Sequence, residues 1–362
     1  MNWHSGFRGR RAVGGRVPRV MFGVAAVSAM VLGMAGIGAG AVAADTVIDT
    51  VPVGGSPLGV AVSPFGSRAY VANNADDSVS VIRTVGNNVV DTVPVGNGPF
   101  GVAITPDGSR VYVTHSGGGT VSVIDTTSNT VVDTIAVGDV PRGLAVSPDG
   151  SRVYVAHLFN FTMSVIDTTS NTVVDTVPVG NGASDVGVTP DGSHVYVTNA
   201  FEDSVSVIET ASNTVVDTVP VGDDPSEVAV SPDGSRVYVT NTLDDTVSVI
   251  ETPGNTVVDT VPVGTSAFGL AVTPDGSRVY VTNTLDDTVS VIETAGNTVV
   301  ETVPVGDDPA FVAVSPLGFR VYVTNFSDDT VSVIAVERCS GSLCIDFGSL
   351  TGSGSGAGSA FS

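Results

Sequence analysis

Short runs rich in Val, Ile, Thr and Tyr alternate with polar turns along most of the chain after residue 45. One set of four runs occupies residues 101–106, 110–115, 120–125 and 130–137, with the turn PDGS between the first two. β-Branched residues and tyrosine favour strands, and Pro-Asp-Gly-Ser is typical of a tight turn. The runs are apolar on both faces and lack helical periodicity, which predicts strands in sheets covered on both sides.

This four-run unit recurs at a spacing of 42 residues, without any insertion. A period of about 40–45 residues built from four strands is typical of a β-propeller blade. We therefore predict an all-β fold, a seven-bladed β-propeller of four-stranded antiparallel blades, over residues 45–338. A DTV phrase marks each unit and begins at Asp49, Asp91, Asp133, Asp175, Asp217, Asp259 and, as ETV, Glu301.

The two ends of the repeat array are offset by one strand. The last unit stops near Val336, after its third run, and an extra fourth run stands at residues 46–53, before the first unit. We expect the N-terminal strand to complete the last blade as its outer strand. Such closure joins the two ends of the ring and leaves only short, protected strand edges.

The second run of each unit carries a tyrosine phrase. In its context, SPDGSRVYVTN, the phrase resembles the YVTN-repeat β-propeller family, and the resemblance extends from Asp45 to about Val336. Membership of that family implies an exported seven-bladed propeller of the surface-layer or cell-surface type, and it implies no single activity. The phrase starts at Tyr112, Tyr196, Tyr238, Tyr280 and Tyr322, and in the variant forms YVAN and YVAH at Tyr70 and Tyr154.

Residues 1–44 have the order of an export signal. Five arginines and no acid precede an apolar run at 20–43, and small residues at Ala43 and Ala44 suggest cleavage there. An uncleaved membrane anchor is the alternative, because the run is long enough to span a bilayer. The Arg10-Arg11 pair leaves the general and the twin-arginine export routes both open. We expect an exported protein, secreted or at the cell surface or periplasm, without a stable membrane span after cleavage.

Residues 339–362 form a separate C-terminal segment. In an exported chain, Cys339 and Cys344 are expected to form a small disulfide loop. The Gly/Ser-rich sequence that follows is expected to be flexible.

Charge narrows the range of partners. The formal net charge is −23, and from residue 45 onward nine arginines and no lysine stand against 37 acids. Such a polyanion repels phosphate backbones, which argues against nucleic-acid binding. It favours a basic protein or cell-envelope component as partner, or metal cations. We expect a monomer.

Antiparallel blades have two different faces. The loops that join the first to the second run and the third to the fourth run form one face, here the turn face, and its sequence is nearly constant. The other loops form the loop face, which carries most of the variation. The residues leading into each first run are expected to rim the central channel: Leu58, Phe100, Arg142, Asp185, Glu227, Phe268 and Phe311.

The second and third units break the pattern together on the loop face. His115 and His157 replace the usual Asn, and the following loops read SGGG and LFNF. We take this region as the best candidate site. The alternative is sequence drift, with His standing in for Asn as a hydrogen-bonding residue. The candidate binding residues are Phe100, Asp139, Arg142, Phe159, Phe161, Phe268 and Phe311.

Most loops between the second and third runs contain acidic pairs. Weak Ca²⁺ binding is one interpretation, because hard cations prefer carboxylate oxygens. Ordinary solvated turn composition is the other. No loop has the spacing of a dedicated calcium site, and no cofactor is expected. The candidate metal residues are Asp244, Asp245, Asp286, Asp287, Asp328 and Asp329.

Two functions fit these patterns. The first is a non-enzymatic binding scaffold at the cell envelope or outside the cell, with its ligand on the acidic loop face. It is favoured because the chain has no nucleophile elbow, zinc, haem or phosphate-loop motif. The alternative is a hydrolase, since some related seven-bladed propellers are lactonases, with a histidine near a carboxylate as general base. Its residues would be His115, His157, Arg142, Asp185 and Glu227.

Overall fold

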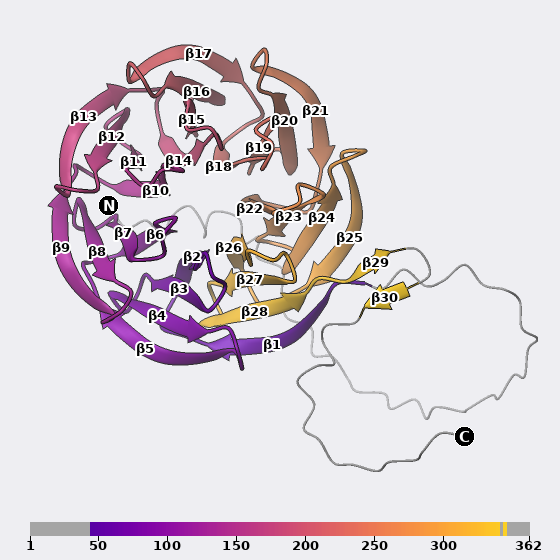
Figure 1. Ribbon diagram of the computed structural model, residues 1–362. Helices are drawn as coiled ribbons and strands as arrows, with labels where there is room; N and C mark the ends of the chain where they lie inside the picture. The colour runs from indigo at the N-terminus through magenta and orange to yellow at the C-terminus, as the bar shows by residue number, and fades with distance from the viewer. Residues whose placement is uncertain (1–43, 341–342, 346–362) are drawn as a thin grey trace, which may run out of the picture. The chain divides into compact units, whose positions relative to one another are not determined.

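The computed structural model describes residues 44–340 and 343–345. Strands β1 to β28 form seven four-stranded antiparallel sheets, and the described residues contain no helix. The predicted seven-bladed β-propeller is confirmed. The first strands of the blades contact one another in sequence order, and the last contacts the first, so the blades close into a ring (Figure 1). These innermost strands are β2 (Pro57–Val62), β6 (Pro99–Ile104), β10 (Pro141–Val146), β14 (Ala183–Val188), β18 (Pro225–Val230), β22 (Ala267–Val272) and β26 (Pro309–Val314).

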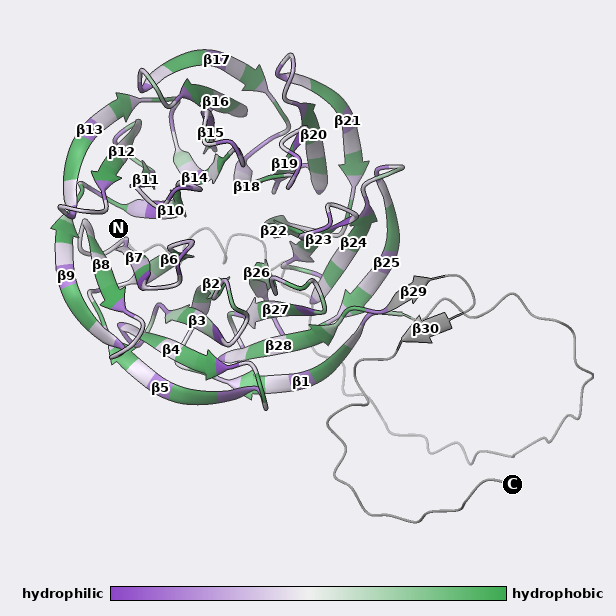
Figure 2. Cartoon of the chain, in the orientation of Figure 1, coloured by the Kyte–Doolittle hydropathy of each residue, from purple (hydrophilic) through white to green (hydrophobic). Residues whose placement is uncertain are grey.

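The second and third strands form the middle of each blade. Their sequences are dominated by Val, Ile, Thr and Tyr, and Figure 2 shows hydrophobic segments on the strands around the ring. The second strands are β3 (Arg68–Asn73), β7 (Arg110–His115), β11 (Arg152–His157), β15 (His194–Asn199), β19 (Arg236–Asn241), β23 (Arg278–Asn283) and β27 (Arg320–Asn325). The third strands are β4 (Ser78–Arg83), β8 (Thr120–Asp125), β12 (Thr162–Asp167), β16 (Ser204–Glu209), β20 (Thr246–Glu251), β24 (Thr288–Glu293) and β28 (Thr330–Ala335).

The outermost strand of the seventh blade comes from the N-terminal end of the array. That sheet has the order β1-β28-β27-β26, with β1 antiparallel to β28, as the offset repeat predicted. The outer strands are β5 (Asn88–Pro94), β9 (Thr130–Ala136), β13 (Thr172–Pro178), β17 (Thr214–Pro220), β21 (Thr256–Pro262), β25 (Thr298–Pro304) and β1 (Thr46–Pro52).

A two-stranded hairpin follows the propeller in sequence, formed by β29 (Arg338–Ser340) and β30 (Leu343–Ile345). Its backbone register pairs Cys339 with Cys344, and the disulfide stays a prediction. The expected signal segment, apart from Ala44, and the Gly/Ser-rich sequence after residue 345 lie outside the described residues. No helix in the described part of the chain is long and apolar enough to cross a membrane.

The first run of each unit is the one whose limits the sequence misplaced most. In the second blade we expected residues 101–106, and β6 is Pro99–Ile104. It ends early because Thr105 already belongs to the turn. The Thr105 Oγ1 donates to Asp107 Oδ1 at 2.5 Å and accepts from the Arg110 amide at 3.1 Å.

The hydrophobic core lies between neighbouring blades. One cluster packs Tyr154, Met163 and Val165 of the third blade against Val195 and Val197 of the fourth, all nearly inaccessible to solvent. The tyrosine hydroxyl can bond across the same interface, as Tyr112 does to Asn171 Oδ1 of the next blade at 3.1 Å. Burial of these apolar faces holds the blades together at roughly 25 cal/mol per Å² of apolar surface.

A second set of contacts links the blades at their outer edge. The Asn of each NTVV phrase or its equivalent has a left-handed backbone, with φ between 44° and 51°. Its side-chain amide donates to the DTV aspartate of the preceding blade, as Asn171 Nδ2 does to Asp133 Oδ2 at 3.0 Å. The same contact occurs at Asn87, Asn129, Asn213, Asn255 and Asn297.

The joint between the sixth and seventh blades uses a different residue. The seventh blade has no third-to-fourth-strand turn, so the linking Asn is missing, and Asp45, immediately before β1, takes its place. Asp45 is 4% exposed and accepts hydrogen bonds from Arg278 Nη1 at 3.0 and 3.1 Å, Tyr280 Oη at 2.5 Å and the Glu337 amide at 2.8 Å. This contact fastens the N-terminal strand to the sixth blade.

Candidate functional site

The loop face is formed as the sequence predicted. The loop after β3 lies against the loop before β2, where the Asn74 amide donates to the Ser56 carbonyl at 3.1 Å. On the turn face, the Thr84 amide donates to the Ser67 carbonyl at 3.2 Å. The variable loops therefore gather on one side of the ring and the nearly constant turns on the other.

The acidic pairs of the loop face bond to backbone amides. The first carboxylate accepts from the loop of its own blade, as Asp244 does from the Asp223 amide at 2.9 Å. The second accepts from the next blade, as Asp245 does from the Ser266 amide at 2.7 Å. The same pattern holds for Asp286, Asp287, Asp328 and Asp329.

These bonds give the repeated acids a structural role. The second residue of each pair has a left-handed backbone, with φ near 50°, which Asp adopts more readily than most side chains. Among the residues that the structure describes, no group of three or more His, Cys, Asp or Glu side chains could hold a metal ion.

A bulge in every innermost strand frees two residues from pairing with the second strand. In β10 the register shifts between Pro141 and Leu144, which leaves Arg142 and Gly143 unpaired. One residue of each such pair is large or charged and the other is small. The pairs are Leu58/Gly59, Phe100/Gly101, Arg142/Gly143, Ser184/Asp185, Ser226/Glu227, Phe268/Gly269 and Ala310/Phe311.

The small residue makes room for the neighbouring blade. A Cβ atom at Gly143 would lie 2.1 Å from Asp185 Oδ1, and one at Gly269 would lie 2.8 Å from the Phe311 Cα. The threonine of the YVT phrase holds the bulge, because Thr240 Oγ1 accepts from the Glu227 amide at 3.0 Å. It also donates to the Phe268 carbonyl of the next blade at 2.6 Å. Bulges of this kind redirect side chains, here toward the ring centre.

The predicted rim residues are brought together, but they pack closely rather than line an open mouth. The Arg142 guanidinium lies 4.6 Å from the Phe100 ring centroid. Phe311 meets Phe100 and Phe268 edge-on, with ring centroids 5.4 and 5.3 Å apart. Leu58 is fully buried, and Arg142, Asp185 and Phe311 are each 8% exposed. We call the seven side chains the channel cluster.

Two carboxyl groups in the channel cluster titrate together. Burial raises the pKa of Asp185 to about 6, although the Val228 amide donates to its Oδ2 at 3.0 Å and Arg142 is near. Burial and the neighbouring Asp185 raise the pKa of Glu227 well above its usual value. Burial lowers the pKa of Arg142 to about 10, so Arg142 keeps its charge at neutral pH. The cluster thus combines one cation with a carboxyl pair able to share a proton.

The histidines occupy the position of the repeat asparagine. His115 and His157 are 0% and 1% exposed, and the Nε2 of each lies 2.8 Å from the hydroxyl of Ser122 or Ser164. In the first blade, Asn73 Nδ2 bonds Ser80 in the same way at 2.9 Å. Burial lowers the pKa of His115 to about 4, which keeps the ring neutral near pH 7. The geometry matches the alternative reading, in which His replaces Asn as a hydrogen-bonding residue.

Exposed aromatic residues lie on the loop face. Phe159 and Phe161 are 55% and 47% exposed, as the LFNF loop predicted, and Asp139 lies close enough to His157 to influence its pKa. Phe159 stacks on Phe201, with ring centroids 6.3 Å apart, and Phe201 is 53% exposed. Sequence reasoning missed Phe201, although it occupies the position of Phe159 in the next unit.

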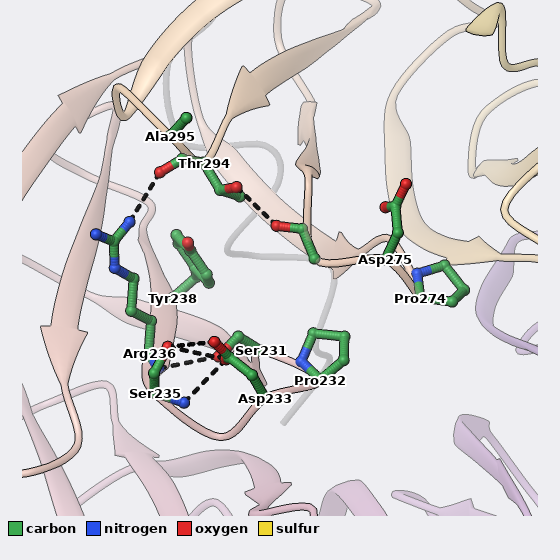
Figure 3. Close-up of a pocket in the computed structure, with 11 residues that line it drawn as sticks. Ser231, Pro232, Asp233, Ser235, Arg236, Tyr238, Pro274, Asp275, Thr294 and Ala295 are labelled. Atoms are coloured by element: carbon green, nitrogen blue, oxygen red, sulfur yellow. Dashed lines mark hydrogen bonds between the residues drawn. The ribbon is translucent and has the colours of Figure 1, made fainter. Parts of the chain in front are cut away.

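A hollow of about 530 Å³ opens on the turn face between the fifth and sixth blades (Figure 3). Its Asp233 accepts from the Ser231 hydroxyl at 2.6 Å and the Ser235 amide at 3.0 Å. Its Arg236 donates to the Thr294 carbonyl at 2.8 Å. These are contacts of the repeated turn itself, so we do not assign the hollow a ligand.

Fold and site define the class of protein, a seven-bladed β-propeller. A family model described as a YNCE-like β-propeller matches residues 7–152 and 226–342, more than half of the chain, and the chain belongs to that family. A model described as a lactonase, 7-bladed β-propeller, matches residues 158–258. The resemblance inferred from the YVTN phrase is thus supported for the propeller class, under these two family descriptions.

Solved structures agree with this class. The chain is similar to one from hydrazine synthase of Kuenenia stuttgartiensis, with a TM-score of 0.71 and 25% identity. The similarity covers 78% of this chain and 96% of that one. No curated protein matches the sequence.

Proposed function

We propose that the protein is an exported, non-enzymatic binding propeller that holds a basic protein or cell-envelope partner on its loop face. The observation that carries the proposal is the separation of charge between the two faces. Within residues 44–337, Arg142 is the one arginine away from the turn face, and it is buried in the channel cluster. The others stand at strand ends beside the turns: Arg68, Arg83, Arg110, Arg152, Arg236, Arg278 and Arg320.

The loop face carries the acidic pairs described above. It also carries an arc of exposed apolar side chains. Phe159, Phe201, Leu243 and Leu285 occupy the same loop position in four consecutive blades and are 55, 53, 72 and 61% exposed. In three of those blades the next residue is an acid: Glu202, Asp244 or Asp286. Exposed apolar groups surrounded by charge are typical of interaction surfaces. Apolar contact would supply affinity, and the acids would attract and orient a basic partner.

Replacing half of the apolar arc should weaken partner capture. We expect a variant with Leu243→Ser and Leu285→Ser to capture at least about tenfold less of a cell-envelope protein bound by the wild type, because central apolar contacts dominate such interfaces. Added salt should weaken the wild-type complex, since exposed charges are screened. Affinity purification from envelope extract, followed by binding titration with the captured protein, measures both effects.

The matched control is Val174→Ser with Val258→Ser, which alters outer-strand valines that are 52% and 46% exposed. It should leave capture unchanged. Equal capture by both variants, with no effect of salt, would show that the loop face is not the binding surface.

A lactonase-like hydrolase is the second candidate. It is favoured by the lactonase-model match at residues 158–258, which includes Asp185 and Glu227. A carboxyl with a pKa near 6 suits general acid–base catalysis at neutral pH. On this hypothesis the protein hydrolyses a lactone or ester from a broad panel, and Glu227→Gln lowers kcat at least about 100-fold. His157→Asn, which restores the repeat residue, should leave activity intact. An inactive wild type, or an active Glu227→Gln, would rule out this site.

A further inference from the structure

Two neighbouring turns on the turn face depart from the repeat. Phe65 in the first blade and Leu317 in the seventh stand where the other five blades have aspartate. They are 81% and 72% exposed. The aspartates at the equivalent position are Asp107, Asp149, Asp191, Asp233 and Asp275.

The replaced aspartate has a clear structural role. Asp149 accepts from the Ser147 hydroxyl at 2.6 Å and from the Ser151 amide at 2.9 Å, which closes the turn. Phe65 is flanked by serines at the same two positions, Ser63 and Ser67. The first blade therefore gives up bonds that its own sequence could make, and it exposes a large aromatic ring instead. That exchange favours a role outside the fold.

The departures lie on adjacent turns, those of the seventh and first blades, and the Phe65 ring extends toward Gly108 of the second blade. A Cβ atom at Gly66 would lie 3.6 Å from Pro316, so the two turns are adjacent. The Thr84 hydroxyl donates to the Gly66 carbonyl at 2.5 Å, which places the next turn, with Val85 at 79% exposure, beside Phe65. We call Phe65, Arg83, Val85 and Leu317 the seam patch.

Charge at the seam patch also differs from the rest of the turn face. Arg83 is exposed and stands where five other blades carry an acid: Asp125, Asp167, Glu209, Glu251 and Glu293. The patch is thus apolar and basic. It is flanked by the acidic turns of the second blade, with Asp107, and of the sixth, with Asp275.

We propose that the seam patch binds a second copy of this chain through a twofold axis. A twofold interface requires a self-complementary surface. Here the apolar centres of two copies can face each other while Arg83 of each lies opposite acidic turns of the other, which is the charge complementarity such an interface needs.

This pairing is independent of the proposed function and has a consequence for it. The seam patch is on the turn face, so a dimer leaves both loop faces open, pointing away from the interface. Two linked loop faces would bind a polyvalent surface with avidity beyond that of one copy.

The repeat itself supplies the variant that tests the dimer. Phe65→Asp with Leu317→Asp restores the residue found in the other five turns, so the fold should be kept and the thermal midpoint should not fall. We expect wild-type full chain to dimerise in a concentration series by sedimentation equilibrium. The double variant should weaken the dimer at least about 100-fold, as loss of central apolar contacts does. Arg83→Glu alone should weaken it to a smaller extent.

Leu243→Asp with Leu285→Asp, the same chemical change on the loop face, is the control and should leave the dimer intact. A wild type that is monomeric at every concentration overturns the proposal. So does a dimer that the seam-patch variants leave unchanged. A monomer whose Phe65 and Leu317 turns are nevertheless protected from hydrogen exchange also overturns it, because another segment or molecule would then cover the patch.

Discussion

Asp45→Ala is expected to lower the free energy of unfolding by about 3 kcal/mol, because it removes the anion of a buried ion pair and leaves the cation unpaired. Asp45 is 4% exposed and pairs with Arg278 Nη1 at 3.0 Å while accepting from the Tyr280 hydroxyl. Removal of the carboxylate would leave the Arg278 charge and the Tyr280 hydroxyl unsatisfied at the joint that closes the ring. Urea unfolding followed by circular dichroism measures the change.

Two control variants distinguish the Asp45 contact between the sixth and seventh blades from the asparagine contacts between the other blades. Asn171→Ala removes the corresponding link between the second and third blades, which joins a neutral amide to the exposed Asp133 carboxylate and contains no ion pair, and should cost about 1 kcal/mol. Asp45→Asn inserts the residue that the repeat uses at this position and should cost less than Asp45→Ala. If Asp45→Ala and Asn171→Ala are equally mild, the N-terminal strand is held by β-pairing alone.

Arg142→Leu should destabilise the protein by about 3 kcal/mol at pH 8 and by less than about 1 kcal/mol at pH 4. At pH 8 the variant must either hold the Asp185–Glu227 pair charged without a nearby cation or keep it protonated at a cost. At pH 4 both carboxyls are protonated in the folded wild type, since the pKa of each is raised above that pH, so they no longer need the cation. Unfolding curves of variant and wild type at the two pH values measure the difference.

The direction of this pH dependence follows from the number of protons that the folded and unfolded states bind. The folded pKa of Asp185 is raised to about 6 from 3.8, so near pH 5 the folded state binds more protons than the unfolded state. The contribution of the Asp185 carboxyl to stability is therefore full below about pH 4 and is lost as pH rises through 6. Removal of Arg142 raises both pKa values further. The pH range over which the stabilising contribution is lost therefore extends to higher pH. Arg110→Leu, on the turn face, should show no such pH dependence, and an equal effect of Arg142→Leu at both pH values would contradict the coupling.

The candidate site was only partly predictable. The repeat alignment pointed to residues that the structure brings together, because they follow the variable loop that leads into each innermost strand. It did not show that they pack into a closed cluster, since the bulge that turns Arg142 and Asp185 inward is a departure from regular strand pairing. The His115 and His157 substitutions looked like active-site chemistry, but their contacts reproduce those of Asn73.

The sequence by itself determined the ring. Seven units of 42 residues, the composition of four strands in each and the displaced fourth run depend on local preferences and on counting, and these specify the number of blades and the strand that closes them. Tertiary structure alone decided what each polar or apolar exception does. The acidic pairs bond loop amides of two blades, and the turns that carry Phe65 and Leu317, far apart in the chain, become adjacent. Contacts between blades exist only when the blades are packed side by side in the propeller, so no pattern within one unit could reveal them.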